Sequence, residues 1–260
     1  MDSKKQLNTQ LVEAAEKSDL ASVEAALAAG ADVNAKEDIE GYTALHHAAS
    51  KNDIGLAQFL VKNNANVEAQ SNTGRHAIHL AVRDGAEDVI KFLIEEAHAN
   101  VLAQTDLNEN LLHKAAFSGK ANILEYLIQK GCTGANDADG LGNTPLAVAA
   151  QEGHIECIEL LLKHGASPGG KAEDNQTPLH ISALWGHTDA INLLLAAKAD
   201  PNAQNARGNT PLHEAAKKNH LGPVKALVAG GADPDIKNSE GQTPADLASK
   251  SLIKKQLVKK

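Results

Sequence analysis

The sequence predicts an all-α fold, a solenoid of helix-turn-helix repeats joined by β-hairpin-like fingers. One short pattern recurs along the chain every 33 or 34 residues, and a period of that length that fills a chain is typical of stacked repeats. Each copy opens with a helix-start signal, carries apolar residues at helical spacing and is followed by a turn-rich segment. Because one repeat cannot bury its apolar face alone, we expect the repeats to stack into an elongated, curved array.

The pattern is most complete in GNTPLHEAAKKNH at 208–220. Related segments are QTPLHISALWGH, NTPLAVAAQEGH, NLLHKAAFSGKA, RHAIHLAVRDGA and YTALHHAASKND. The residues at the first position of the pattern are Thr9, Thr43, His76, Asn110, Thr144, Thr177, Thr210 and Thr243. This recurrence predicts a single array, 1–260, with repeats near 5–37, 38–70, 71–104, 105–138, 139–171, 172–204 and 205–237, and a C-terminal cap at 238–260.

The copy at 208–220 shows how one repeat is expected to fold. Thr210 is placed to cap the first helix and Pro211 to open it, because the hydroxyl accepts an orphan N–H and proline needs no donor there. We expect Asn219 to end this helix and the second helix to stop at Gly230-Gly231, a left-handed C-cap. The residues predicted to form the packed face are Leu212, Ala215, Ala216, Val224, Leu227 and Val228.

The composition suits thin, closely packed helices rather than a large globular core. Apolar residues make up 42% of the chain, yet it holds one tryptophan, two tyrosines and three phenylalanines. The net charge of −8 argues against nucleic acid as the main partner. From Pro211 onward the balance reverses, with nine lysines against five acidic residues. We interpret this lysine-rich end as a solvated cap, with a weak contact to an anionic surface as the alternative.

Cysteine usage and hydropathy bear on the compartment. Cys132 and Cys157 lie in different repeats and form no disulfide framework, which favours a reducing environment. The sequence shows no apolar run long enough for a membrane span and no segment typical of a signal peptide. These features predict a cytoplasmic protein and leave a nuclear location or non-classical export open.

The histidines suggest catalysis only until their spacing is considered. Five occupy one position of the repeated pattern, and three more recur every 33 residues at the end of the first helix. Repetition therefore explains most of them as architecture. No thiol or carboxylate set with metal-ligand spacing accompanies them, and His154-Ile-Glu-Cys157 offers only two ligands. The sequence predicts no catalytic residue, no metal site and no cofactor.

One segment imitates a phosphate-binding loop. GASPGGKA, residues 165–172, matches G-x-x-x-x-G-K until Ala172, which stands where a hydroxyl should hold magnesium. A phosphate loop also joins a strand to a helix, whereas this segment follows a predicted helix and enters a finger. We interpret it as a glycine-loosened finger.

The T-P-L-H-x-A-A pattern, followed by L-L-x-x-G-A-D-x-N, resembles the ankyrin repeat over nearly the whole chain. The resemblance implies protein–protein binding through the finger tips and the exposed, concave face of the first helices. It also implies that the histidines His46, His79, His113, His180 and His213 form hydrogen bonds across the motif and to neighbouring repeats. At the positions of this sequence that match those surfaces, the candidate partner-binding residues are Tyr42, Arg75, Arg83, Leu107, Glu109, Phe117, Leu141, Gln151, Glu152, Leu184, Trp185, Arg207, Lys217 and Lys218.

The aromatic residues divide into two groups. Phe59, Phe92 and Tyr126 share one second-helix position, 16 residues after the first position of the pattern, and are predicted to be core. Tyr42, Phe117 and Trp185 fall on positions that the repeat leaves free. Large aromatics on a polar face are enriched at binding hot spots, so we expect the surface around Trp185 to dominate binding.

The sequence therefore predicts a non-enzymatic protein-binding module that acts as an adaptor, a scaffold or a regulator of a partner protein and is monomeric alone. One alternative is a pathogen effector that binds a host protein. A second, less favoured alternative is a nucleic-acid or anionic-membrane binder that uses the lysine-rich C-terminus. No small-molecule substrate is expected.

Overall fold

The computed structural model describes residues 3–257, which form sixteen α-helices and one short 3-10 helix, Glu173–Asn175. The first helices of the repeats are α1 (Ser3–Glu16), α3 (Ala44–Ser50), α5 (Ala77–Asp84), α7 (Leu111–Phe117), α9 (Pro145–Glu152), α11 (Pro178–Trp185), α13 (Pro211–Lys218) and α15 (Pro244–Leu247). The second helices are α2 (Leu20–Ala28), α4 (Ile54–Lys62), α6 (Glu87–Glu95), α8 (Ala121–Gln129), α10 (Ile155–Lys163), α12 (Thr188–Ala196), α14 (Leu221–Ala229) and α16 (Ser251–Leu257). Among the described residues no strand forms, and the only bridge joins Gln104 to Asn110. The predicted all-α repeat fold is confirmed.

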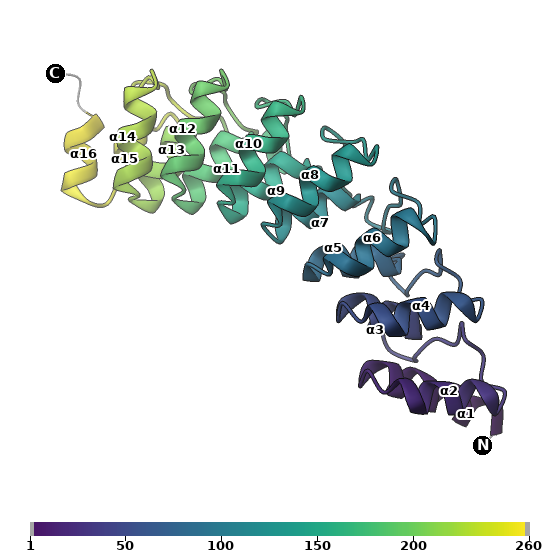
Figure 1. The fold of residues 1–260 in the computed structure, drawn as a ribbon. Helices are drawn as coiled ribbons and strands as arrows, with labels where there is room; N and C mark the ends of the chain where they lie inside the picture. The colour runs from purple at the N-terminus through teal and green to yellow at the C-terminus, as the bar shows by residue number, and fades with distance from the viewer. Residues whose placement is uncertain (1–2, 258–260) are drawn as a thin grey trace. The chain divides into compact units, whose positions relative to one another are not determined.

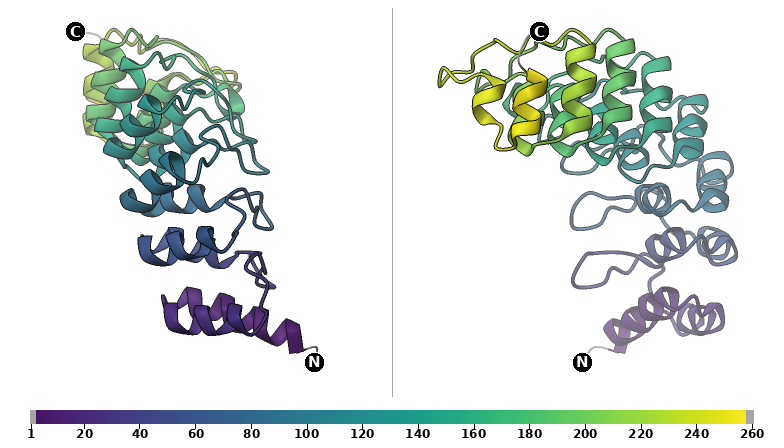
Figure 2. Two further views of the ribbon diagram at one scale, coloured as in Figure 1. Left: turned by 45° about the vertical axis from the view of Figure 1, so that its right-hand side comes forward. Right: turned by 90° about the vertical axis from the view of Figure 1, so that its left-hand side faces the viewer.

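The chain divides into two compact units, Met1–Thr133 and Gly134–Lys260, at the finger between α8 and α9. In the first unit, α1, α3, α5 and α7 pack side by side, and each contacts the second helix of its own repeat. In the second unit, α9, α11, α13 and α15 form the corresponding layer, with α10, α12, α14 and α16 behind them (Figure 1). Each unit thus has a layer of first helices, a layer of second helices and a row of fingers (Figure 2).

The repeated histidine fixes the start of each first helix. In repeat seven, Nε2 of His213 lies 3.0 Å from the carbonyl oxygen of Gln242. Because a carbonyl only accepts, Nε2 carries the proton and Nδ1 accepts from the backbone N–H of Thr210 at 3.0 Å. The same pairs occur at His46 and His180, where Nε2 lies 2.9 Å from the carbonyl oxygen of the next finger. Each of these histidines ties a helix to the following repeat, as the resemblance implied.

The core is built from leucine, isoleucine, valine and alanine, and two sequence expectations about it are wrong. Leu212, Ala215, Ala216, Val224 and Leu227 are buried as predicted. Val228 is 38% exposed because it lies on the outer side of α14. Of the three aromatics assigned to the core, only Phe92 is buried, whereas Phe59 and Tyr126 are half-buried.

Tyr126 lies beside a hollow of about 210 Å³ between α6 and α8, which Ile90 and Ile123 also line. Its hydroxyl donates to Glu95 Oε1 at 3.0 Å, so the polar end of the ring faces the surface. Desolvation raises the pKa of this phenol to about 12, with the Glu95 carboxylate adding to the shift. Tyr126 is therefore a surface residue of the second-helix layer.

A second departure concerns the first repeat. In the other repeats the first residue of the pattern caps the first helix, whereas α1 starts at Ser3 and runs through Thr9. The additional turn brings Asn8 to the first finger, where its Oδ1 accepts from the backbone N–H of Asp32 at 2.8 Å. Asn34 does the same for the next finger, at 2.7 Å from the N–H of Asn66. The extra turn thus supplies the first finger with the acceptor that later fingers receive from the preceding finger.

Candidate partner-binding surface

The candidate residues fall into both compact units. Those in the first unit are Tyr42, Arg75, Arg83, Leu107, Glu109 and Phe117, and those in the second are Leu141, Gln151, Glu152, Leu184, Trp185, Arg207, Lys217 and Lys218. The two sets lie on separately described units, so each is considered by itself.

In the first unit, only the two apolar candidates extend fully into solvent. Phe117, the last residue of α7, is 53% exposed, and Leu107, in the finger before that helix, is 57% exposed. Tyr42 is half-buried, because its ring stacks on His46 at 5.4 Å between centroids and meets His47 edge-on at 5.9 Å. Tyr42 therefore contributes to the packing between helix and finger as well as to the surface.

The polar candidates of the first unit are engaged within the protein. Arg75 Nη1 donates to the Tyr42 hydroxyl at 3.2 Å. Arg83 holds its neighbour Asp84 through two hydrogen bonds of 2.7 and 2.8 Å, which raise the pKa of the arginine. Glu109 pairs with Lys114 at 2.6 Å. A partner that used these side chains would have to compete with existing contacts.

In the second unit, Trp185 is the largest exposed side chain. It is the last residue of α11 and is 57% exposed, because Gly186 ends the helix in the left-handed region with φ of 90°. Leu184 beside it is half-buried. The expectation that Trp185 projects from the end of this first helix is confirmed.

The equivalent helix ends on either side carry charge. Glu152 and Gln151 end α9, and the Gln151 amide donates to the Glu152 carboxylate at 3.1 Å. Lys217 and Lys218 end α13 and are both exposed. Since α11 packs between α9 and α13, Trp185 has an acidic neighbour in one repeat and basic neighbours in the next. We call Gln151, Glu152, Leu184, Trp185, Lys217 and Lys218 the Trp185 surface.

The finger tips continue this pattern. Leu141, at the tip before α9, is 59% exposed. In the next two fingers Arg207 Nη2 lies 3.5 Å from Asp174 Oδ2, and the Ala206 N–H donates to the Asp174 carbonyl oxygen at 2.7 Å. Both charged side chains are largely exposed, so the ion pair is solvated and weak.

A polar groove of about 500 Å³ adjoins the basic end of the Trp185 surface, between the fingers that precede α13 and α15. Arg207 and Lys217 line it, together with Asn209, Ser239 and Gln242. The sequence singled out the two cations but not the last three residues. They occupy framework positions of the fingers, and only the spacing of the fingers turns them into the wall of a groove.

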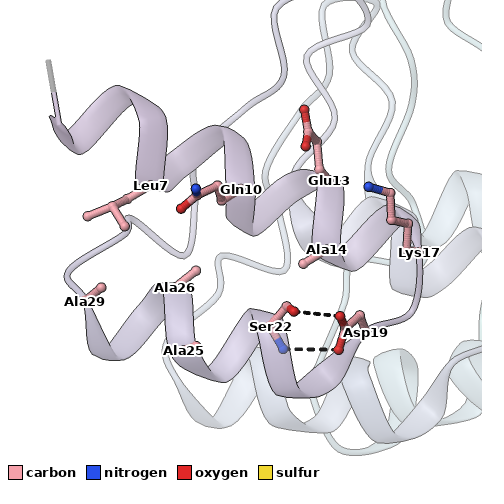
Figure 3. Close-up of a pocket in the computed structure, with 10 residues that line it drawn as sticks. All are labelled: Leu7, Gln10, Glu13, Ala14, Lys17, Asp19, Ser22, Ala25, Ala26 and Ala29. Carbon is pink, nitrogen blue, oxygen red and sulfur yellow. Dashed lines mark hydrogen bonds between the residues drawn. The ribbon is translucent and has the colours of Figure 1, made fainter. Parts of the chain in front are cut away.

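A second hollow, of about 420 Å³, lies between α1 and α2 and is lined largely by alanine (Figure 3). The main polar contact at this hollow joins two of its own lining residues. The Asp19 carboxylate accepts from the Ser22 hydroxyl at 2.6 Å and from the Ser22 N–H at 3.1 Å, and thereby caps α2 (Figure 3). These bonds lower the pKa of Asp19. The carboxylate thus caps α2, and the other polar residues that line the hollow are Gln10, Glu13 and Lys17 (Figure 3).

The structure also bears on metal and nucleotide chemistry. Among residues 3–257, no three His, Cys, Asp or Glu side chains are arranged to hold a metal ion. Cys157 is buried, and burial raises the pKa of its thiol to about 11. In the segment that imitates a phosphate loop, Gly165 follows the end of α10, and the acidic 3-10 helix Glu173–Asn175 comes next. In the described part of the chain no helix is long and apolar enough to cross a membrane.

Comparisons with known proteins agree with this architecture. The family model described as ankyrin repeats in three copies matches residues 11–105, 98–172 and 179–259. The crystal structure of the human ASB11 ankyrin repeat domain superposes with a TM-score of 0.75 at 26% identity, covering 83% of this chain and 96% of that one.

Among curated sequences, the Notch-regulated ankyrin repeat-containing proteins of Xenopus tropicalis and Homo sapiens are each 34% identical over 58 residues. That match takes in 22% of this chain and 51% of each relative. The chain thus spans about half the length of the curated relatives it matches.

Proposed function

Because this chain belongs to the ankyrin repeat family and is a protein–protein interaction module, we propose that it acts as an adaptor, a scaffold or a regulator that binds a partner protein through the Trp185 surface. The observation that carries the proposal is the position of Trp185. Its indole is 57% exposed at the end of α11, where the packing of the repeat does not need it.

Exposed tryptophan is unusual on a polar surface and is the residue most enriched at binding hot spots. Leu184 extends the apolar area, and Glu152, Lys217 and Lys218 surround it with charge. An apolar centre with a polar border is the usual anatomy of a stable interface.

The test is capture of binding proteins from lysate by the full chain and by Trp185→Ala, followed by affinity measurement with each purified partner. We expect Trp185→Ala to weaken binding at least tenfold, which corresponds to about 1.4 kcal/mol. The melting temperature should change little, because the side chain is mostly in solvent.

Two matched variants control the experiment. Val228→Ala removes an exposed apolar side chain from the second-helix layer and should leave affinity unchanged. Leu179→Ala empties a fully buried position near the start of the same helix and should lower stability by about 2–5 kcal/mol. If Trp185→Ala unfolds the protein but leaves the affinity of the folded fraction intact, the tryptophan is part of the framework and the proposal is wrong.

A further inference from the structure

The charges around Trp185 are sorted by sign along the second compact unit. On the side of α9 lies Glu152, and the finger directly before α11 carries Glu173 and Asp174, of which Asp174 contacts Arg207. On the side of α13 lie Arg207, Lys217 and Lys218. The chain as a whole carries a net charge of −8, so a cluster of three exposed cations departs from its average surface.

In the groove beside Lys217, the side-chain oxygens of two asparagines already accept hydrogen bonds. Asn238 Oδ1 accepts from the N–H groups of Glu240 and Gln242, each at 3.0 Å. Asn209 Oδ1 accepts from Asn238 Nδ2 at 2.9 Å. Within residues 3–257, Lys217 has no ion-pair partner, and Arg207 has only the long contact to Asp174. The cationic ends of Arg207 and Lys217 therefore remain to meet a ligand.

The buried carboxylate below the groove does not cancel this preference. Glu214 is 8% exposed and accepts hydrogen bonds from Asn209 Nδ2 at 2.9 Å and from Asn205 Nδ2 at 3.3 Å. Both bonds go to Oε1 of this carboxylate. Glu240 lies at the rim and is the one acidic side chain that lines the groove.

Distances between repeats set the spacing that an occupant needs. Glu152, Trp185 and Lys218 are equivalent positions of successive repeats. Adjacent packed helices lie about 10 Å apart, and an extended polypeptide advances about 3.3 Å per residue. One repeat therefore corresponds to roughly three residues of an extended chain.

We propose that the partner presents an extended polypeptide segment with an apolar side chain on Trp185. An acidic side chain roughly three residues to one side lies in the groove of Arg207 and Lys217, and a basic or uncharged residue roughly three residues to the other side lies near Glu152. This inference rests on the proposed function and specifies the chemistry of the partner. Charge complementarity over the surface selects the register of the segment more than it adds affinity.

A polyanion with uniform charge fits the surface less well. A phosphate backbone or an anionic membrane that reached Lys217 and Lys218 would also approach Glu152, Glu173 and Asp174, and like charges repel. The mixed charge on either side of an apolar centre favours a polypeptide of mixed charge.

The test uses the full chain and a displayed library of random twelve-residue peptides, depleted on the Trp185→Ala variant before selection on the unmodified protein. We expect the recovered peptides to share an acidic residue about three positions from an apolar or aromatic one. The most enriched peptide, labelled with a fluorophore, should bind Lys217→Glu/Lys218→Glu at least tenfold more weakly than the unmodified chain. Lys163→Glu/Lys225→Glu makes the same charge change on the second-helix layer and should bind it within twofold.

Each outcome has a distinct meaning. If no peptide survives depletion on Trp185→Ala, the tryptophan does not bind polypeptide, and both the proposed function and this inference are wrong. If peptides depend on Trp185 but carry no shared acidic residue and ignore the Lys217/Lys218 reversal, the proposed function stands and this inference is overturned. Binding of phosphatidylserine vesicles or duplex DNA that is tighter than peptide binding and is lost in Lys217→Glu/Lys218→Glu also overturns it.

Discussion

Asn202 joins its own finger to the next one through Asp233. The side-chain Oδ1 of Asn202 accepts from the backbone N–H of Asp233 at 2.8 Å, while its Nδ2 donates to the carbonyl oxygen of Gly231 at 3.4 Å. Asn136 makes the same pair of bonds to Ser167 and Gly165, at 2.7 and 2.9 Å. Equivalent bridges therefore fasten successive fingers of the second unit. The position between these two asparagines in the repeat is Gly169, which has no side chain to form the bridge.

The missing bridge predicts a stabilising substitution. A Cβ built on Gly169 meets nothing within 4 Å, and its φ is not in the left-handed region. By analogy with Asn202, Gly169→Asn should bond to the N–H of Asp200 and the carbonyl oxygen of Lys198. Gly169→Ala measures the effect of replacing glycine, with its large conformational entropy in the unfolded chain, without adding the bridge. Relative to that variant, we expect the two new hydrogen bonds of Gly169→Asn to raise the free energy of unfolding by about 1 kcal/mol. Asn202→Ala should cost about 1 kcal/mol. Urea unfolding of the three variants measures both, and equal stability of Gly169→Asn and Gly169→Ala would contradict the bridge.

The same comparison predicts uneven local stability. The finger at 165–175 contains Pro168, Gly169 and Gly170, and glycine raises the cost of ordering the backbone. The finger at 198–208 carries Asn202 and its two bonds. Native-state hydrogen exchange should therefore be faster at 165–175 than at 198–208. Equal protection of the two fingers would show that the side-chain bridge is unimportant.

Buried histidines predict a loss of stability in mild acid. Burial, together with the charges of His47, His76 and Lys36, lowers the pKa of His46 to about 4. Burial, together with His76 and Lys114, lowers the pKa of His79 to about 3. The unfolded chain has histidine pKa values near 6.5, so between about pH 6.5 and 4 it takes up protons that the folded protein does not. Stability is complete above this window and should fall by about 2 kcal/mol or more as pH drops through it.

The check is the unfolding free energy at pH 7, 5.5 and 4.5. His79→Gln removes one buried imidazole and should reduce the slope with pH, even though it lowers stability at pH 7. His164→Gln, at an exposed position after α10, should leave the slope unchanged. A slope that His79→Gln does not alter would rule out this histidine as a source of acid sensitivity.

Nucleotide binding should be undetectable. Lys171 is exposed, Ala172 offers no hydroxyl, and the following 3-10 helix Glu173–Asn175 begins with two acidic residues instead of the free N–H groups of a long helix. Calorimetric titration with ATP and magnesium should therefore show no heat of binding. Micromolar affinity for ATP would mean that this segment binds nucleotide, as its match to the phosphate-loop pattern would then indicate.

The sequence alone determined the length of the repeat, the start of the first helix in repeats two to eight, and which side of the repeat, core or surface, most side chains occupy. A Thr with a His three residues later specifies a local set of bonds, seen at Thr177 and His180, that needs only one further carbonyl from the next repeat. Trp185 could likewise be assigned to the surface, because it falls on a position that the repeat leaves free, at the end of a short helix that stops at glycine. Such features repeat with the chain, so periodicity reveals them.

Only the tertiary structure decided the features that differ between equivalent positions of the repeats. Phe92 and Tyr126 occupy the same repeat position, yet one is buried and the other is half-buried beside the hollow between α6 and α8. The groove of Arg207 and Lys217 exists only because two fingers of adjacent repeats are held at a particular separation. Burial and concavity depend on how closely neighbouring repeats approach, which is set by the sum of their packing contacts rather than by the residue at one position.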